Sequence, residues 1–204
     1  MPRTARVLPE EGFLHVFTRG NNKRYIFRKD RDFKIYLELL KKYKERFGLI
    51  IYHYALMSNH IHLLCKICAG TNLGKLMQGL GLSYSNRYRK RYEFTGQFWQ
   101  GRYKSNVIEN DEYFLRCGLY IERNPVDAGL VKRPELYQWS SYGAYAFGKK
   151  DYIIDRDPLF ETLEKNDIER RKVYIEMMNS TLKKFKDARI AKLELLGLQL
   201  EYSK

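Results

Sequence analysis

The segment "LIIYHYALMSNHIHLLCKI", residues 49–67, decides the fold because it contains two strands and the turn between them. Its first part, 49–56, is rich in β-branched and aromatic residues, which is typical of a buried strand. Ser58 and Asn59 favour a tight turn, and residues 60–67 then return as the second strand. The segment therefore predicts an antiparallel hairpin.

Two histidines occupy the second strand of this hairpin. Side chains at i and i+2 of a strand point to the same face, so His60 and His62 lie side by side. Neutral imidazoles at this spacing can hold one divalent cation, although two polar residues at a sheet edge would give the same pattern. Cys65 and Cys68 suggest zinc as an alternative, but alternation puts Cys65 on the opposite face, which disfavours a four-ligand zinc site.

A strand and a helix are expected before the hairpin. "FLHVFTRG" (13–20) has strand-like composition and is followed by turn-forming residues. After Asp30, which we expect to be the N-cap, apolar residues recur at spacings of three and four. Gly48 is placed to close this helix.

Three further elements are expected after the hairpin. The apolar residues within 73–91 recur on one side of a helix, so this segment predicts a second helix. Residues 97–109 indicate another strand. A third helix begins near Asp111 and is expected to stop by Asn124, because Pro125 disfavours helical geometry in the residue before it.

The order of these elements predicts an α+β fold. It is close to a ferredoxin-like antiparallel sheet, βαββαβ, with an added helix against it. Residues 1–156 are expected to form this domain. Residues 157–204 are helical and highly charged, and we interpret them as a C-terminal extension.

The composition indicates a polyanionic partner. The net charge is +14, with 38 Lys and Arg against 24 Asp and Glu, and 17 tyrosines accompany it. Basic surfaces attract nucleic acid and aromatic rings can stack on unpaired bases, although tyrosines in a core would look the same. The basic residues are spread along the chain, which disfavours a membrane surface. The sequence shows no apolar run long enough to cross a membrane and no signal peptide. The three cysteines are interpreted as reduced thiols. A cytoplasmic location is therefore expected.

The third helix carries a polar face. Tyr113, Cys117, Tyr120 and Asn124 follow spacings of four, three and four, so they share one side. A phenol is a nucleophile in some enzymes, and an amide oxygen is a hard metal ligand. The other interpretation is a core-facing tyrosine and an ordinary helix-terminating asparagine.

Several segments together resemble the HUH single-tyrosine transposases, in the branch of REP-associated tyrosine transposases. They are "FTRGNNKRYIF" (17–27), "YALMSNHIHLL" (54–64), "SNRYRKRYEFTGQFWQGRYKS" (85–105), "YIERNPVDAGLV" (120–131) and "WSSY" (139–142). The resemblance covers most of residues 10–145.

The resemblance implies a catalytic site. His60 and His62 would be the ligands of Mg²⁺ or Mn²⁺, Tyr120 the nucleophile, and Asn124 the third polar ligand. The implied reaction is transesterification of single-stranded DNA through a 5′-phosphotyrosine link. A tyrosine hydroxyl is protonated at neutral pH, and the sequence does not identify its proton acceptor.

This chain departs from the family pattern at two positions. Ser58 replaces a usual proline, which we expect to alter only the turn, and Asp127 stands where an arginine is frequent.

The expected partner is single-stranded DNA, with a hairpin implied by the resemblance. The candidate DNA-binding residues are Arg19, Asn21, Asn22 and Lys23 in the N-terminal segment, and Arg87, Tyr88, Arg89, Arg91, Arg102, Tyr103 and Lys104 in the second helix and following strand. Tyr88 and Tyr103 are the expected stacking residues. The protein would then be associated with the nucleoid.

Three alternatives stay open at this point. The protein could be a non-catalytic nucleic-acid-binding regulator on the same fold, or an HUH nuclease of the relaxase or replication-initiator type. A structural metal protein is the third. The sequence leaves open a monomer or a homodimer, and whether the tyrosine acts in its own subunit.

Overall fold

The computed structural model describes residues 8–195, with side chains up to residue 184. The strands are β1 (Gly12–Arg19), β2 (Ile50–Met57), β3 (His60–Ile67) and β4 (Lys104–Ile108). The α-helices are α1 (Asp30–Phe47), α2 (Leu73–Tyr92), α3 (Asp111–Asp127), α4 (Tyr142–Phe147), α5 (Pro158–Thr162) and α6 (Asp167–Leu195). Two short 3-10 turns are η1 (Asn21–Lys23) and η2 (Pro134–Leu136).

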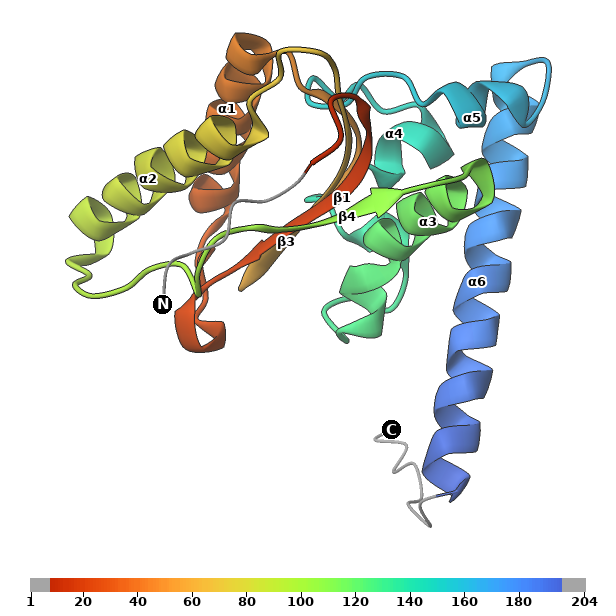
Figure 1. Ribbon diagram of the computed structural model, residues 1–204. Coiled ribbons are helices and arrows are strands. Elements are labelled where there is room, and N and C mark those ends of the chain that lie inside the picture. Colours follow the sequence, from red (N-terminus) through yellow and green to blue (C-terminus); the bar gives the residue numbers. More distant parts are fainter. Residues whose placement is uncertain (1–7, 196–204) are drawn as a thin grey trace.

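The four strands form one antiparallel sheet in the order β2-β3-β1-β4. Helices α1 and α2 lie together on one side of the sheet, whereas α3 and α4 lie on the other (Figure 1). This is the topology of a ferredoxin-like unit, in which each crossover helix returns the chain to a strand of the same sheet. The expected α+β fold is confirmed, including the added helix.

Strand β3 has two chemically different faces. Ile61, Leu63 and Cys65 are buried in the core beneath α1 and α2. His60 and His62 lie on the other face, as the period of two requires. Cys65 therefore does not converge with the histidines on one ion, as expected from the sequence.

Helix α3 packs closely on the histidine face of the sheet. Phe114 and Ile121 contribute to a second core cluster with Leu64 of β3. Gly118 lies over His53 of β2, where an added Cβ would be only 2.9 Å from the ring nitrogen Nε2. The missing side chain lets the helix approach the sheet, and this fixes the height of α3 above β3.

The predicted end of the third helix is wrong, because α3 continues through Pro125 to Asp127. Proline has no N–H, so the carbonyl of Ile121 loses its normal helical donor. The side-chain nitrogen of Asn124 lies 3.4 Å from that carbonyl oxygen and 2.7 Å from the carbonyl oxygen of Tyr120. This side-chain donor compensates for the missing N–H, and one more turn forms.

Two other boundaries also differ from expectation. The strand expected over 97–109 is confined to β4, because the chain before it turns toward α2, where Trp99 Nε1–H donates to the carbonyl of Gly81 (3.0 Å). Asp30 is the first residue of α1 rather than its cap. The carboxylate of Asp32 accepts from the backbone N–H groups of the two residues before the helix.

The segment after residue 157 packs on the same body. Phe160, Tyr174 and Met178 form a third core cluster with Tyr145 of α4 and Leu119 of α3. Figure 1 shows α6 running along this side and extending beyond the sheet. The division at residue 157 stays a prediction. Among the described residues, no helix combines the length and apolarity needed to cross a membrane.

Candidate active site

The two histidines of β3 form the centre of the site. His60 and His62 lie with their ring centroids 4.9 Å apart on the face toward α3. The Nδ1–H of His60 donates to Oδ1 of Asn59 (2.5 Å). Nε2 of His60 is therefore the ring nitrogen that remains for a ligand.

A third histidine, which the sequence analysis missed, joins this pair. His15 of β1 lies diagonally across from His62, since β1 and β3 are paired with Phe17 opposite His62. Nε2 of His15 and Nδ1 of His62 are hydrogen-bonded at 2.8 Å. A lone histidine between Phe13 and Phe17 in an apolar strand was the available signal, but its partner depends on the strand register.

All three histidines are held in their neutral form. Burial lowers the pKa of His15 to about 4. Burial, with the cation of Arg19 adding to it, lowers the pKa of His60 to about 4. The pKa of His62 falls to about 2, chiefly through burial, and repulsion from His15, His60 and Arg19 adds to this. Neutral imidazoles keep a lone pair, which is the form that binds a metal.

Tyr120 reaches the histidines from α3 of the same chain. Its ring meets the rings of His15 and His62 edge-on, with both centroid distances 6.0 Å. The residue is 41% exposed, so Tyr120 is accessible from the solvent. One chain therefore supplies both the histidine pair and the phenol.

Asn124 follows Tyr120 by one turn of α3. Its side-chain nitrogen donates to carbonyl groups of its own helix, which leaves the amide oxygen as the atom suited to a cation. In the described part of the chain, no group of three or more His, Cys, Asp or Glu is arranged to hold a metal ion. A metal on the histidine pair would thus need an oxygen ligand that is not a carboxylate, such as a side-chain amide.

A buried charged cluster anchors α3 behind Tyr120. His53 of β2 lies 2.9 Å from a carboxylate oxygen of Glu122 and 3.0 Å from one of Asp157. Glu122 also accepts from Ser141 Oγ (2.5 Å) and Tyr174 Oη (2.7 Å). Burial opposes protonation of His53, but the two carboxylates raise its pKa to about 9. The imidazole of His53 thus joins β2 to α3 and to the start of α5, and the hydrogen bond from Tyr174 joins α6 to Glu122.

Comparison with known families now gives a clear result. The model of a family described as IS200-like transposases matches residues 11–124, more than half of the 204 residues. This chain belongs to the IS200-like transposase family. The family expected from the sequence is confirmed. Comparison with curated protein sequences gives no match.

Solved transposase structures are similar to this IS200-like chain. A REP-associated tyrosine transposase bound to a REP hairpin superposes with a TM-score of 0.62 and 17% identity, over 77% of this chain and 93% of that one. A provisionally assigned transposase from Deinococcus radiodurans R1 gives a TM-score of 0.42 and 13% identity, over 60% of this chain and 97% of that one. The first likeness shows a shared fold.

Two of the candidate DNA-binding residues of this IS200-like chain lie on the histidine face. Arg19 is paired with His60 across β1 and β3, and Lys104 is paired with Phe17 across β1 and β4. Both side chains are exposed, and Nζ of Lys104 lies 5.6 Å from the centre of the Phe17 ring. These two cations flank the histidines.

The candidate residues in η1 lie beside the turn that precedes His60. Asn59 accepts from the N–H of Gly20 through its carbonyl (2.9 Å). Its side-chain nitrogen donates to the carbonyl of Lys23 (3.2 Å). Asn21 is half-buried, whereas Asn22 and Lys23 are exposed. The structure thus brings the N-terminal candidates close to the histidine pair.

The candidates on α2 are less uniform. Arg87 is exposed, Arg89 donates to the carbonyl of Gly96 (3.1 Å), and Arg91 pairs with Asp32 (3.0 Å). The stacking role expected for Tyr88 is wrong. The residue is only 3% exposed, because the rings of Phe94 and Phe98 pack on it and its hydroxyl donates to the carbonyl of Tyr25 (3.1 Å).

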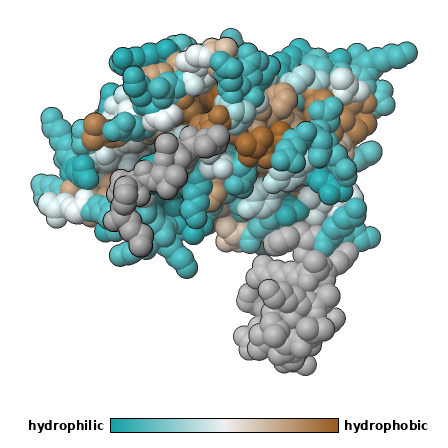
Figure 2. Space-filling view, viewed as in Figure 1, coloured by the Kyte–Doolittle hydropathy of each residue, from teal (hydrophilic) through white to brown (hydrophobic). Residues whose placement is uncertain are grey.

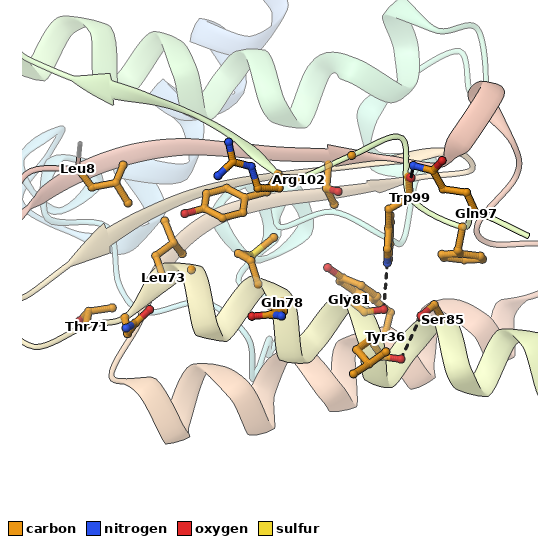
Figure 3. Close-up of a pocket in the computed structure, with 18 of the residues that line it drawn as sticks. Leu8, Tyr36, Thr71, Leu73, Gln78, Gly81, Ser85, Gln97, Trp99 and Arg102 are labelled. Atoms are coloured by element: carbon orange, nitrogen blue, oxygen red, sulfur yellow. Dashed lines mark hydrogen bonds between the residues drawn. The ribbon is translucent and has the colours of Figure 1, made fainter. Parts of the chain in front are cut away.

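A groove of about 1060 Å³ runs between α2 and the segment before β4. Arg89, Arg102 and Tyr103 line it, and Figure 3 shows the ring of Trp99 pointing from that segment to Gly81 of α2. The groove lies on the α1 and α2 side of the sheet, away from the histidines. The candidate DNA-binding residues therefore form two separate groups, one on each side of the sheet. Figure 2, seen from the same side as Figure 1, shows a mostly hydrophilic surface with a hydrophobic band across its middle.

Proposed function

We propose that this protein is a DNA transposase that cuts and rejoins single-stranded DNA through a covalent bond to Tyr120. The observation that carries the proposal is the position of Tyr120, whose ring lies 6.0 Å from the rings of both His15 and His62. The family match supports a transposase, and the residues of the site supply the finer chemistry.

The donor set fits a divalent metal. Nε2 of His60 and Nε2 of His62 would be two ligands, and the amide oxygen of Asn124 would be the third. When bound, Mg²⁺ or Mn²⁺ would polarise the scissile phosphate and stabilise the charge that develops on it. Imidazole is a softer ligand than Mg²⁺ usually prefers, so we expect good activity with Mn²⁺.

Tyr120 would perform the covalent step. Its oxygen attacks the phosphorus atom and forms a phosphotyrosine bond to the 5′ side, while the bond to the 3′ oxygen breaks and releases a 3′-hydroxyl. The reverse attack by a 3′-hydroxyl restores a phosphodiester and frees Tyr120 without ATP. Arg19 and Lys104 would hold the DNA backbone beside the histidines, since both are exposed cations on that face.

The proposed substrate is single-stranded DNA with a hairpin. The structurally similar transposase was solved with a REP hairpin, and the net charge of +14 suits a polyanion. Because one chain provides both histidines and tyrosine, a monomer would suffice for cleavage, and a homodimer is not needed to complete the site.

An adduct assay tests this function. End-labelled single-stranded hairpin DNA from the regions flanking the gene is incubated with the protein and Mn²⁺, and covalent complexes are resolved on a denaturing gel. We expect an adduct from the wild type and none from Tyr120→Phe. Tyr113→Phe is the matched control, since Tyr113 is an exposed tyrosine on the same helix. Adducts from Tyr120→Phe, or none from the wild type, would refute the proposal.

A further inference from the structure

The contact between His15 and His62 has a consequence for metal binding. The two ring nitrogens in this hydrogen bond, Nε2 of His15 and Nδ1 of His62, are 2.8 Å apart. A neutral imidazole has one N–H and one lone pair, so one of the two rings must donate and the other must accept.

The direction of this bond decides whether His62 can be a ligand. If Nδ1–H of His62 donates, its Nε2 keeps a lone pair. If Nε2–H of His15 donates instead, the only proton of His62 must sit on Nε2, and no lone pair points away from His15. The first arrangement is therefore the one compatible with a metal on Nε2 of His62.

We infer that His15 is a positioning residue that fixes His62 in the tautomer with the proton on Nδ1, so that Nε2 of His62 is free for a divalent metal. This inference rests on the proposed function, because it assigns His15 a part in the metal site. His15 is not itself a ligand in this arrangement, since its Nε2 is occupied by the bond to His62.

The arrangement around His60 gives independent support. The side-chain nitrogen of Asn59 donates to the carbonyl of Lys23, which turns Oδ1 of Asn59 toward His60. Oδ1 can only accept, so Nδ1 of His60 must carry its proton and Nε2 is free. Both histidines of the pair are thus held through Nδ1 by a neighbour, a common arrangement for histidines that bind metals.

The packing around His15 keeps its ring in place. The side chain is 8% exposed, and the rings of His15 and His62 are stacked with centroids 5.1 Å apart. The ring of Phe17 lies 6.0 Å from that of His15 and 5.9 Å from that of His62, so it packs against both rings. A neutral His15 whose Nε2 accepts must carry its own proton on Nδ1. It then has no lone pair left to take the proton of Tyr120, so His15 is excluded as the base.

Nitrogen NMR on the histidine rings tests the inference without metal or DNA. The chain has only four histidines, and long-range ¹H–¹⁵N spectra distinguish a protonated from an unprotonated ring nitrogen. At neutral pH we expect His62 and His15 both to carry the proton on Nδ1. A proton on Nε2 of His62 in the wild type would overturn the inference, whatever the adduct assay gives.

Metal titration of variants provides the second measurement. Mn²⁺ binding to the DNA-free protein is measured by calorimetry for the wild type, His15→Phe and His15→Gln. We expect His15→Phe to weaken Mn²⁺ binding about 10- to 100-fold, as loss of a neighbour of a metal-bound histidine usually does. His15→Gln keeps an acceptor and should recover most of the affinity. If His15→Phe binds Mn²⁺ as tightly as the wild type, the role of His15 is refuted. The proposed function would not be affected, because the adduct assay tests it separately.

Two further outcomes are decisive. If the wild type binds no Mn²⁺, both the proposed metal site and the role of His15 fail, even where the adduct forms. If circular dichroism shows that His15→Phe does not fold, the inference is tested by two other measurements. These are the tautomer of His62 in the wild type and the Mn²⁺ affinity of His15→Gln.

Discussion

The ring of Tyr120 on α3 meets the ring of His62 on β3 edge to face, with centroids 6.0 Å apart in a single chain. The contact exists because α3 packs on the histidine face of the sheet while α1 and α2 cover the opposite face. The phenol and the candidate metal ligands are therefore brought together by the fold of one subunit.

Metal removal should abolish the chemistry and leave the fold intact. We expect EDTA to stop adduct formation, Mn²⁺ to restore it, and the melting temperature to stay unchanged, because the sheet is held by its apolar cores. His62→Ala should slow adduct formation at least about 100-fold, since a metal supplies several kcal/mol of transition-state stabilisation. Unfolding of the protein by EDTA would instead indicate a structural metal.

The buried cation of His53 should make stability depend on pH. Its folded pKa of about 9 lies above the ordinary value of 6.5. The stabilisation that protonated His53 gives to the folded state is thus complete below about pH 6.5 and is lost as the pH rises through about 9. This shift corresponds to about 3 kcal/mol in the free energy of unfolding. Urea unfolding at a series of pH values measures it.

Glu122→Gln is the control for this pH dependence. It removes the charge that raises the pKa of His53, so the loss of stability between neutral and alkaline pH should shrink. A wild type equally stable across this range would show that His53 is not the buried cation described above.

Gly118→Ala should destabilise the protein. The new Cβ would lie 2.9 Å from Nε2 of His53, so it must displace a ring that is bonded to two carboxylates. We expect a loss of about 1–3 kcal/mol in urea unfolding, although alanine is the better helix former. Gly74→Ala is the matched control, because its Cβ meets only Asn72 Oδ1 at 3.5 Å, and it should not lower stability.

DNA binding should weaken steeply as salt increases. Phosphate contacts release counterions, so the logarithm of the affinity falls linearly with the logarithm of salt concentration. Arg19→Ala and Lys104→Ala should each reduce this slope by about 1. Arg156→Ala is the control, because Arg156 is already paired with Asp167, the first residue of α6. This substitution should leave the slope unchanged. A flat salt response of the wild type would contradict the DNA-binding surface.

Several features of the site follow from short stretches of sequence. Alternation along residues 60–67 puts His60 and His62 on one face and Cys65 on the other, and both placements are found. The helical spacing of Tyr120 and Asn124 likewise places them one turn apart on α3. The element order also gives the ferredoxin-like sheet, because each crossover helix can cover only one face.

Other features depend on contacts that no local pattern contains. Tyr88 lies among basic residues, as a stacking residue would, but the rings of Phe94 and Phe98 from the segment before β4 bury it. Pro125 predicts a helix end, but the side chain of Asn124 bonds to the carbonyl that proline leaves without a donor. Each error arose where a tertiary contact or a side-chain hydrogen bond outweighed a local preference.

The sequence by itself determined which residues share a strand face or a helix face, because backbone periodicity is set by consecutive residues. The tertiary structure alone decided that His15 meets His62 and that His53 is enclosed by Glu122 and Asp157. These pairs depend on strand register and helix docking, which are fixed by the packing of apolar side chains far apart in the chain.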